Sequence, residues 1–144
     1  MLKALSVLCV FGMAGGLVAQ FGTRSLFSSS PWVIIPQAGA LLLLLWARLT
    51  FGRRSFHAAA NPTAGGLVTS GPYHYIRHPI YTAVTVFSMA GVVAHWSWTS
   101  GLLGALVWGS ALVRMFCEET LVTARYPEYR QYAATTRRMI PYLF

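Results

Sequence analysis

Two short polar segments hold most of the residues that could do chemistry in this sequence. The first reads Arg77-His78-Pro79-Ile80-Tyr81 and the second contains Arg114, Glu118 and Glu119. Pro79 suits the first turn of a helix with His78 just before it, which would leave backbone N–H groups available to an anion such as a carboxylate. Arg114 and Glu118 are four residues apart and would share a helix face. The two segments together indicate a site for a ligand that carries both charges.

A helical hairpin would bring these segments together. Residues 79–113 form an uncharged stretch of 35 residues, which is too long for one membrane crossing and suits two. Residues 95–98 break it, and Thr99-Ser100-Gly101 predict a tight turn. Pro79 lies 20 residues before the predicted midpoint and Glu118 lies 20 after it, each about 30 Å away in a helix. The two arms therefore place both polar segments at the same depth.

The composition predicts that these elements lie in a membrane. The chain has 144 residues, of which 56% are hydrophobic and 10% charged, with a mean hydropathy of +0.54. These values argue against an ordinary soluble domain, a disordered chain or a doubly wound nucleotide-binding fold. We expect a single all-α, polytopic membrane domain over residues 1–144 whose last two transmembrane helices are the hairpin. Its four predicted spans are residues 4–23, 31–48, 79–97 and 99–117. A cleaved signal peptide is the alternative for the first of them.

The basic residues predict the orientation. With a cytoplasmic N-terminus, ten of the eleven Lys and Arg residues lie inside and only Arg24 lies outside. This places both termini, a loop at 50–78 and a tail at 118–144 in the cytoplasm. The tail is expected to contain an amphipathic helix on the membrane surface. This excess of basic residues on the cytoplasmic side explains the net charge of +8 without a nucleic-acid partner. The histidines and cysteines show no metal-ligand spacing.

One ligand that fits such a site is S-adenosylmethionine. Glutamates could bind its ammonium group or ribose diol, His78 and helix N–H groups its carboxylate, and tyrosines its sulfonium. The composition alone does not single out this ligand.

The motifs also carry a resemblance. The run from Leu67 to Tyr81, followed by Arg114, Glu118-Glu119 and residues 125–132, resembles the isoprenylcysteine carboxyl methyltransferase family, which belongs with the membrane phospholipid methyltransferases. The similarity extends over about residues 65–144. It implies an integral membrane enzyme that binds S-adenosylmethionine in a pocket closed by the loop and tail. A lipophilic or lipidated acceptor would enter from the bilayer.

The resemblance also implies roles for individual residues. Arg114 would position the acceptor, and His78 would take part in catalysis. Glu119 either completes the acidic pair of the cofactor site or is structural. The implied cofactor-binding residues are Gly66, Leu67, Val68, Tyr73, His78, Pro79, Ile80, Tyr81, Glu118 and Glu119.

The acceptor chemistry decides whether a base is needed. A carboxylate or thiolate is already a nucleophile, whereas an amine or thiol must lose a proton, which His78 or Glu119 could take. We expect isoprenylcysteine-type carboxyl O-methylation, with phospholipid N-methylation and small-thiol S-methylation as alternatives. A small four-helix transporter or a structural subunit is the alternative of another class. The sequence leaves the oligomeric state open.

Overall fold

The fold is a bundle of helices with a short irregular tail. The structure is a computed structural model and describes residues 1–52 and 66–144, so residues 53–65 of the predicted loop lie outside the described part. Within the described residues there is no strand, and the all-α prediction is confirmed. The elements in order are α1 (Leu2–Gly22), α2 (Pro31–Phe51), the 3-10 helix η2 (Gly71–His74), α3 (Pro79–Ala94), α4 (Trp98–Arg125) and α5 (Tyr129–Thr135).

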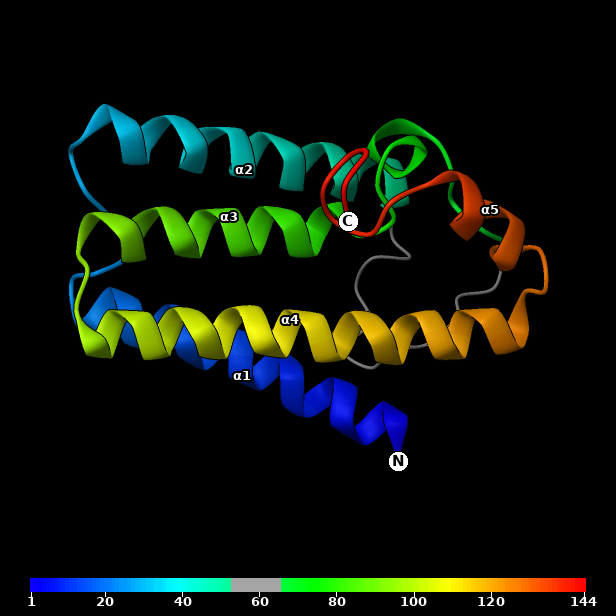
Figure 1. Ribbon diagram of the computed structural model, residues 1–144, viewed down its shortest axis with the longest axis horizontal. Coiled ribbons are helices and arrows are strands. Elements are labelled where there is room, and N and C mark those ends of the chain that lie inside the picture. The colour runs from blue at the N-terminus through cyan, green and yellow to red at the C-terminus, as the bar shows by residue number, and fades with distance from the viewer. Residues whose placement is uncertain (53–65) are drawn as a thin grey trace.

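The long helices alternate in direction, so that the N-terminus of α3 and the C-terminal half of α4 reach the same end of the bundle (Figure 1). α2 packs along α3, and α1 crosses α4 obliquely. Small residues permit these close approaches. A Cβ atom at Gly16 of α1 would lie 2.6 Å from a methyl group of Val107 on α4. The buried core between the helices includes Met13, Ala111 and Met115.

Three of the four predicted spans are confirmed as helices long and apolar enough to cross a membrane, namely α1, α2 and α4. Large apolar side chains such as Leu8, Trp32 and Leu42 point outward from α1 and α2, as expected for faces in contact with lipid. α3 is a shorter apolar helix of 16 residues, about 24 Å long. The predicted span at residues 79–97, which corresponds to α3, therefore stays a prediction.

The hairpin forms, but its turn differs from the prediction. Ser97 caps α4, accepting a hydrogen bond from the Ser100 amide while the Ser100 side chain accepts from the Ser97 amide. Thr99, Ser100 and Gly101 thus lie in the first turn of α4, and the predicted tight turn there is wrong. Reciprocal capping of this kind favours helix initiation at Ser97. α4 also continues to Arg125, past the predicted span end at residue 117.

The tail contains one short helix. α5 has only 7 residues, and Tyr126 caps the end of α4 instead of joining it. After α5 the chain runs parallel to the segment that precedes α3, through a bridge between Ile76 and Arg137. The tail therefore ends beside the start of α3 (Figure 1).

Candidate functional site

The segment Arg77–Tyr81 is fixed by α3 and by the tail. As predicted, α3 begins with Pro79, and His78 is the residue before it. Backbone amides of Arg77 and His78 donate to the carbonyls of Arg137 and Arg138 at 2.7 and 2.9 Å. These bonds hold the start of α3 against the tail. The tail and the first turn of α3 together fix the backbone that carries the Arg77 and His78 side chains.

The first polar network joins α1, α3 and α4. The Tyr81 hydroxyl donates to Oε1 of Glu118 at 2.6 Å, and Nε of Arg114 donates to the same hydroxyl at 2.6 Å. Arg114 also forms an ion pair with Glu118 at 3.2 Å and donates to the Ser6 carbonyl at 2.7 Å. The Arg114 side chain is 6% exposed and that of Glu118 is 26% exposed. The guanidinium is buried and bonded through all three of its nitrogens, while one carboxylate edge reaches solvent.

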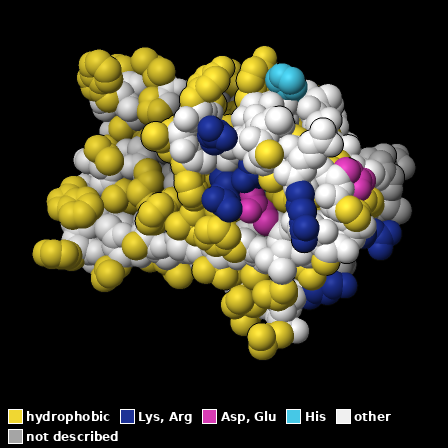
Figure 2. All heavy atoms as spheres, turned by 45° about the vertical axis from the view of Figure 1, so that its right-hand side comes forward, with side chains coloured by type: hydrophobic (Ala, Val, Ile, Leu, Met, Phe, Trp, Pro, Cys, Tyr) yellow, Lys and Arg dark blue, Asp and Glu magenta, His cyan; other side chains and the backbone are white. Residues whose placement is uncertain are grey.

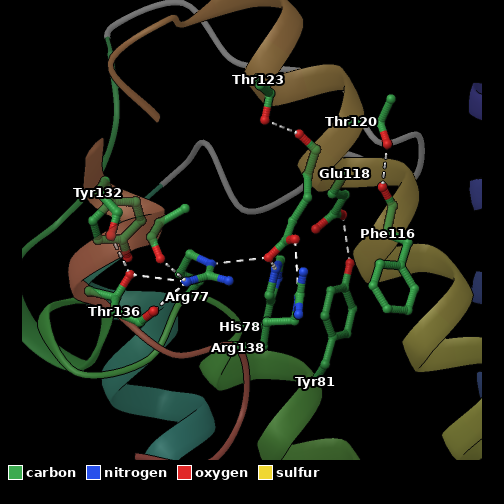
Figure 3. Close-up of polar contacts among 12 residues, drawn as sticks. Arg77, His78, Tyr81, Phe116, Glu118, Thr120, Thr123, Tyr132, Thr136 and Arg138 are labelled. Atoms are coloured by element: carbon green, nitrogen blue, oxygen red, sulfur yellow. Dashed lines mark hydrogen bonds and ion pairs between the residues drawn. The ribbon is translucent and has the colours of Figure 1, made fainter. Parts of the chain in front are cut away.

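The second polar network is centred on Glu119 and includes Arg77, His78 and Arg138, which are labelled in Figure 3. Its Oε1 accepts from Nε of Arg77 at 3.0 Å and lies 3.1 Å from Nε2 of His78. Its Oε2 accepts from Nε of Arg138 at 3.1 Å. The side chains of Glu119 and Arg77 are 14% and 7% exposed. Both oxygens of Glu119 are therefore engaged by basic side chains.

Arg77 links this second network to the tail. Its Nη1 donates to the Ala133 carbonyl at 2.9 Å and to the carbonyl of Thr136. The Tyr132 hydroxyl makes a further link by donating to the Tyr73 carbonyl at 2.5 Å. Burial raises the pKa of Tyr132 to about 12 and raises that of Tyr129 as well, so both phenols stay neutral near pH 7.

The structure brings together some of the predicted site residues and places others apart. The ring of His78 stacks on that of Tyr81, with centroids 5.7 Å apart, and both residues contact the acidic pair. Tyr73 is buried in η2 with its ring 5.3 Å from that of Phe51. Ile80 and Pro79 lie in the first turn of α3. Three more, Gly66, Leu67 and Val68, are half-buried in the irregular segment before η2, with φ of +80° at Gly66.

A pocket of about 410 Å³ opens beside the second network. Glu119 is the one residue of the predicted set that lines it; the wall also includes Arg77, Arg130, Thr136, Arg137 and Arg138. The sequence pattern predicted no site role for Arg138, Thr136 or Ser6. The charge of Arg138 next to the apolar C-terminal residues could have indicated its role. We find no sequence pattern that would have indicated Thr136 or Ser6. Among the residues that the structure describes, no three His, Cys, Asp or Glu side chains gather as metal ligands would.

Comparison with known proteins finds relatives among metal-resistance proteins. The chain is 32% identical over 82 residues to the cobalt-zinc-cadmium resistance protein CzcN of Cupriavidus metallidurans and to the nickel-cobalt-cadmium resistance protein NccN of Alcaligenes xylosoxydans xylosoxydans. These matches cover 54% of this chain and 36% and 37% of the two relatives, so the chain spans little more than a third of their length. No solved structure matches it.

A sequence model for phospholipid methyltransferases matches residues 38–129. This range runs from α2 to the start of α5 and contains both polar networks except for Ser6 of α1 and the tail residues. The match covers more than half of the chain and confirms the resemblance seen in the motifs. The three long apolar helices agree with an integral membrane protein. The chain therefore belongs to the phospholipid methyltransferase family.

Proposed function

We propose that this protein is an S-adenosylmethionine-dependent membrane methyltransferase that acts on a lipophilic acceptor. The observation that carries the proposal is the meeting of the two polar segments, with Tyr81 bonded to Glu118 at 2.6 Å and His78 to Glu119 at 3.1 Å. Because ionisable residues are costly in so apolar a protein, a buried group of them is read as functional. We place this site, with both termini, on the cytoplasmic side.

The residues around Glu118 fit the cofactor. Both protein contacts of Glu118 use Oε1, and within residues 1–52 and 66–144 its Oε2 has no partner. That oxygen can accept hydrogen bonds from an ammonium group or a ribose diol. The neighbouring Tyr81 ring offers an electron-rich face to a sulfonium. When bound, S-adenosylmethionine supplies an electrophilic methyl group. We propose that the remaining cofactor contacts are those predicted from the sequence, namely Gly66, Leu67, Val68, Tyr73, His78, Pro79 and Ile80.

The surroundings of Glu119 favour an acceptor that arrives already deprotonated. Glu119 is bonded to Arg77, His78 and Arg138, and Glu118 is paired with Arg114. The basic side chains around Glu119 stabilise its ionised form and make it a weak proton acceptor. A carboxylate acceptor needs positioning and exclusion of water, not a base. We therefore propose carboxyl O-methylation of an isoprenylcysteine-type acceptor, ahead of phospholipid amine or thiol methylation.

Arg114 is proposed to position the acceptor. Its three guanidinium nitrogens already contact Tyr81, Ser6 and Glu118, so an acceptor carboxylate would compete with Glu118 for the guanidinium. We propose that the acceptor reaches the guanidinium edge that Glu118 now contacts.

Cofactor binding tests the proposal directly. Calorimetric titration of the detergent-purified protein with S-adenosylhomocysteine should give saturable binding, and Glu118→Gln should abolish it while Glu128→Gln, a change at an exposed acid, leaves it intact. Arg114→Ala should preserve binding and lower turnover. Thermal unfolding of each variant checks that it is folded. No binding by the parent protein at about 500 µM, within the upper range of common substrate affinities, would overturn the proposal.

A transfer assay with labelled cofactor identifies the acceptor. It compares a farnesylcysteine carboxylate, phosphatidylethanolamine and a small alkyl thiol in the same detergent. Label should enter the carboxylate, and entry only into the amine or the thiol would contradict carboxyl methylation without affecting the cofactor proposal.

A further inference from the structure

The tail pocket has more positive charge than its own carboxylate balances. Four arginines line it, namely Arg77, Arg130, Arg137 and Arg138, against the single acid Glu119. Glu119 is fully engaged by Arg77, His78 and Arg138. Within the described residues, Arg130 and Arg137 have no ion pair or side-chain hydrogen bond, so two guanidinium groups in the pocket have no side-chain partner.

Two of the four arginines are fixed in place. Arg77 is bonded to the tail carbonyls, and the Arg138 guanidinium lies over the rings of Phe116 and Phe144 at 5.2 and 5.6 Å. The Phe144 oxygen accepts backbone N–H groups of Met139 and Ile140. Arg130 and Arg137 are exposed at the pocket mouth. A guanidinium matches the geometry of phosphate oxygens and binds them through two parallel hydrogen bonds.

The surface around the pocket indicates where such an anion comes from. Basic side chains gather around an acidic one on this face, with apolar side chains beside them (Figure 2). Tyr142 and Leu143 are exposed next to the arginines, a combination typical of the membrane interface, where lipid headgroups lie. A volume of about 410 Å³ suits a headgroup better than a bare ion.

We propose that Arg130 and Arg137 form a binding site for a phosphate-bearing anion in the tail pocket, separate from the methyl-transfer site and supplied by a lipid headgroup. The anion would neutralise the two unpaired guanidinium groups and tie the tail to the membrane surface. A free phosphate offers the same chemistry and is the alternative source.

Binding of short-chain lipids tests this site. The full chain in detergent is titrated with dioctanoyl phosphatidic acid, dioctanoylglycerol and inorganic phosphate. Phosphatidic acid should bind, and Arg130→Gln with Arg137→Gln should weaken it about tenfold or more, since hydrogen bonds to charged groups are lost. The charge-matched control, Lys3→Gln with Arg125→Gln, changes two exposed residues outside the pocket and should leave the affinity unchanged.

Comparison of the three ligands and the two double variants distinguishes the possible outcomes. Tighter binding of phosphatidic acid than of phosphate supports the lipid source, and equal binding supports a free phosphate. Equal binding of dioctanoylglycerol, or an equal loss in both double variants, overturns the site. Loss of lipid binding after saturation with S-adenosylhomocysteine also overturns it, because the pocket would then belong to the cofactor. Each single arginine variant repeats the test if the double variant does not fold.

Discussion

Glu118 and Glu119 are neighbours in the sequence but lie in different surroundings. Glu118 meets the Tyr81 phenol of α3 and the Arg114 guanidinium of its own helix through a single oxygen. Glu119 faces the tail, where Arg77, His78 and Arg138 engage both of its oxygens. The Glu118 side chain is also the more exposed, at 26% against 14%.

This difference indicates a division of roles. A carboxylate whose hydrogen-bonding capacity is used by the protein contributes to structure, and one that retains an oxygen for solvent can bind a ligand. We interpret Glu119 as the anchor of the tail and Glu118 as the cofactor contact. Three substitutions can break or sharpen this comparison.

Glu119→Gln should have the largest effect on stability. It leaves Arg77 and Arg138 without their carboxylate, and removing one partner of a buried ion pair costs about 3–5 kcal/mol. Thermal unfolding in detergent should show a larger loss than for Glu118→Gln, and limited proteolysis should cut the tail faster. The exposed Glu128→Gln is the control. Equal stability of the Glu119 and Glu128 variants would contradict the anchor role.

Tyr81→Phe should have an intermediate effect on stability, confined to the network that contains Arg114 and Glu118. It removes the hydroxyl shared by Arg114 and Glu118, and a buried polar group that loses its partner costs about 1–3 kcal/mol. The unfolding temperature and the affinity for S-adenosylhomocysteine should both fall, while cleavage of the tail stays at the parent rate. Tyr75→Phe, at an exposed tyrosine, serves as the comparison. Faster cleavage of the tail in the Tyr81 variant would show that the two networks are not independent.

Tyr132→Phe should have the smallest effect, confined to the tail. The lost hydrogen bond to the Tyr73 carbonyl is worth about 0.5–1.5 kcal/mol. Proteolysis of the tail should speed up while cofactor affinity remains that of the parent. Tyr142→Phe, at an exposed tail residue, controls for the loss of a phenol. A fall in cofactor affinity would place Tyr132 in the methyl-transfer site.

The pairing of the acidic residues with the Arg77–Tyr81 segment could be predicted from the sequence because the two arms of a hairpin have a fixed rise per residue. The small error in the predicted position of the turn did not change which residues meet across the hairpin. Moving the turn from residues 99–101 to the cap at Ser97 shifts the register by less than one helical turn. Long charged side chains span that difference.

Contacts between distant segments could not be predicted. Arg114 bonds to Ser6, and Arg77 bonds to the Ala133 carbonyl in the tail. Such contacts depend on how α1 crosses α4 and on the path of an irregular chain, and neither leaves a pattern in the sequence. Helix α4 extends past the predicted span for a related reason. Hydropathy falls at Glu118, but helix formation continues to Arg125 because the charged residues find partners.

The continuous helix α4 also constrains how this sequence can change. Each residue added or removed in a helix rotates everything that follows by about 100°. Between the cap at Ser97 and the acidic pair, apolar residues facing lipid can be exchanged for one another, but their number cannot vary. A single insertion there would turn Glu118 away from Tyr81 and Glu119 away from Arg77. In this protein the number of residues in the apolar part of α4 is constrained, whereas the identity of its lipid-facing side chains is not.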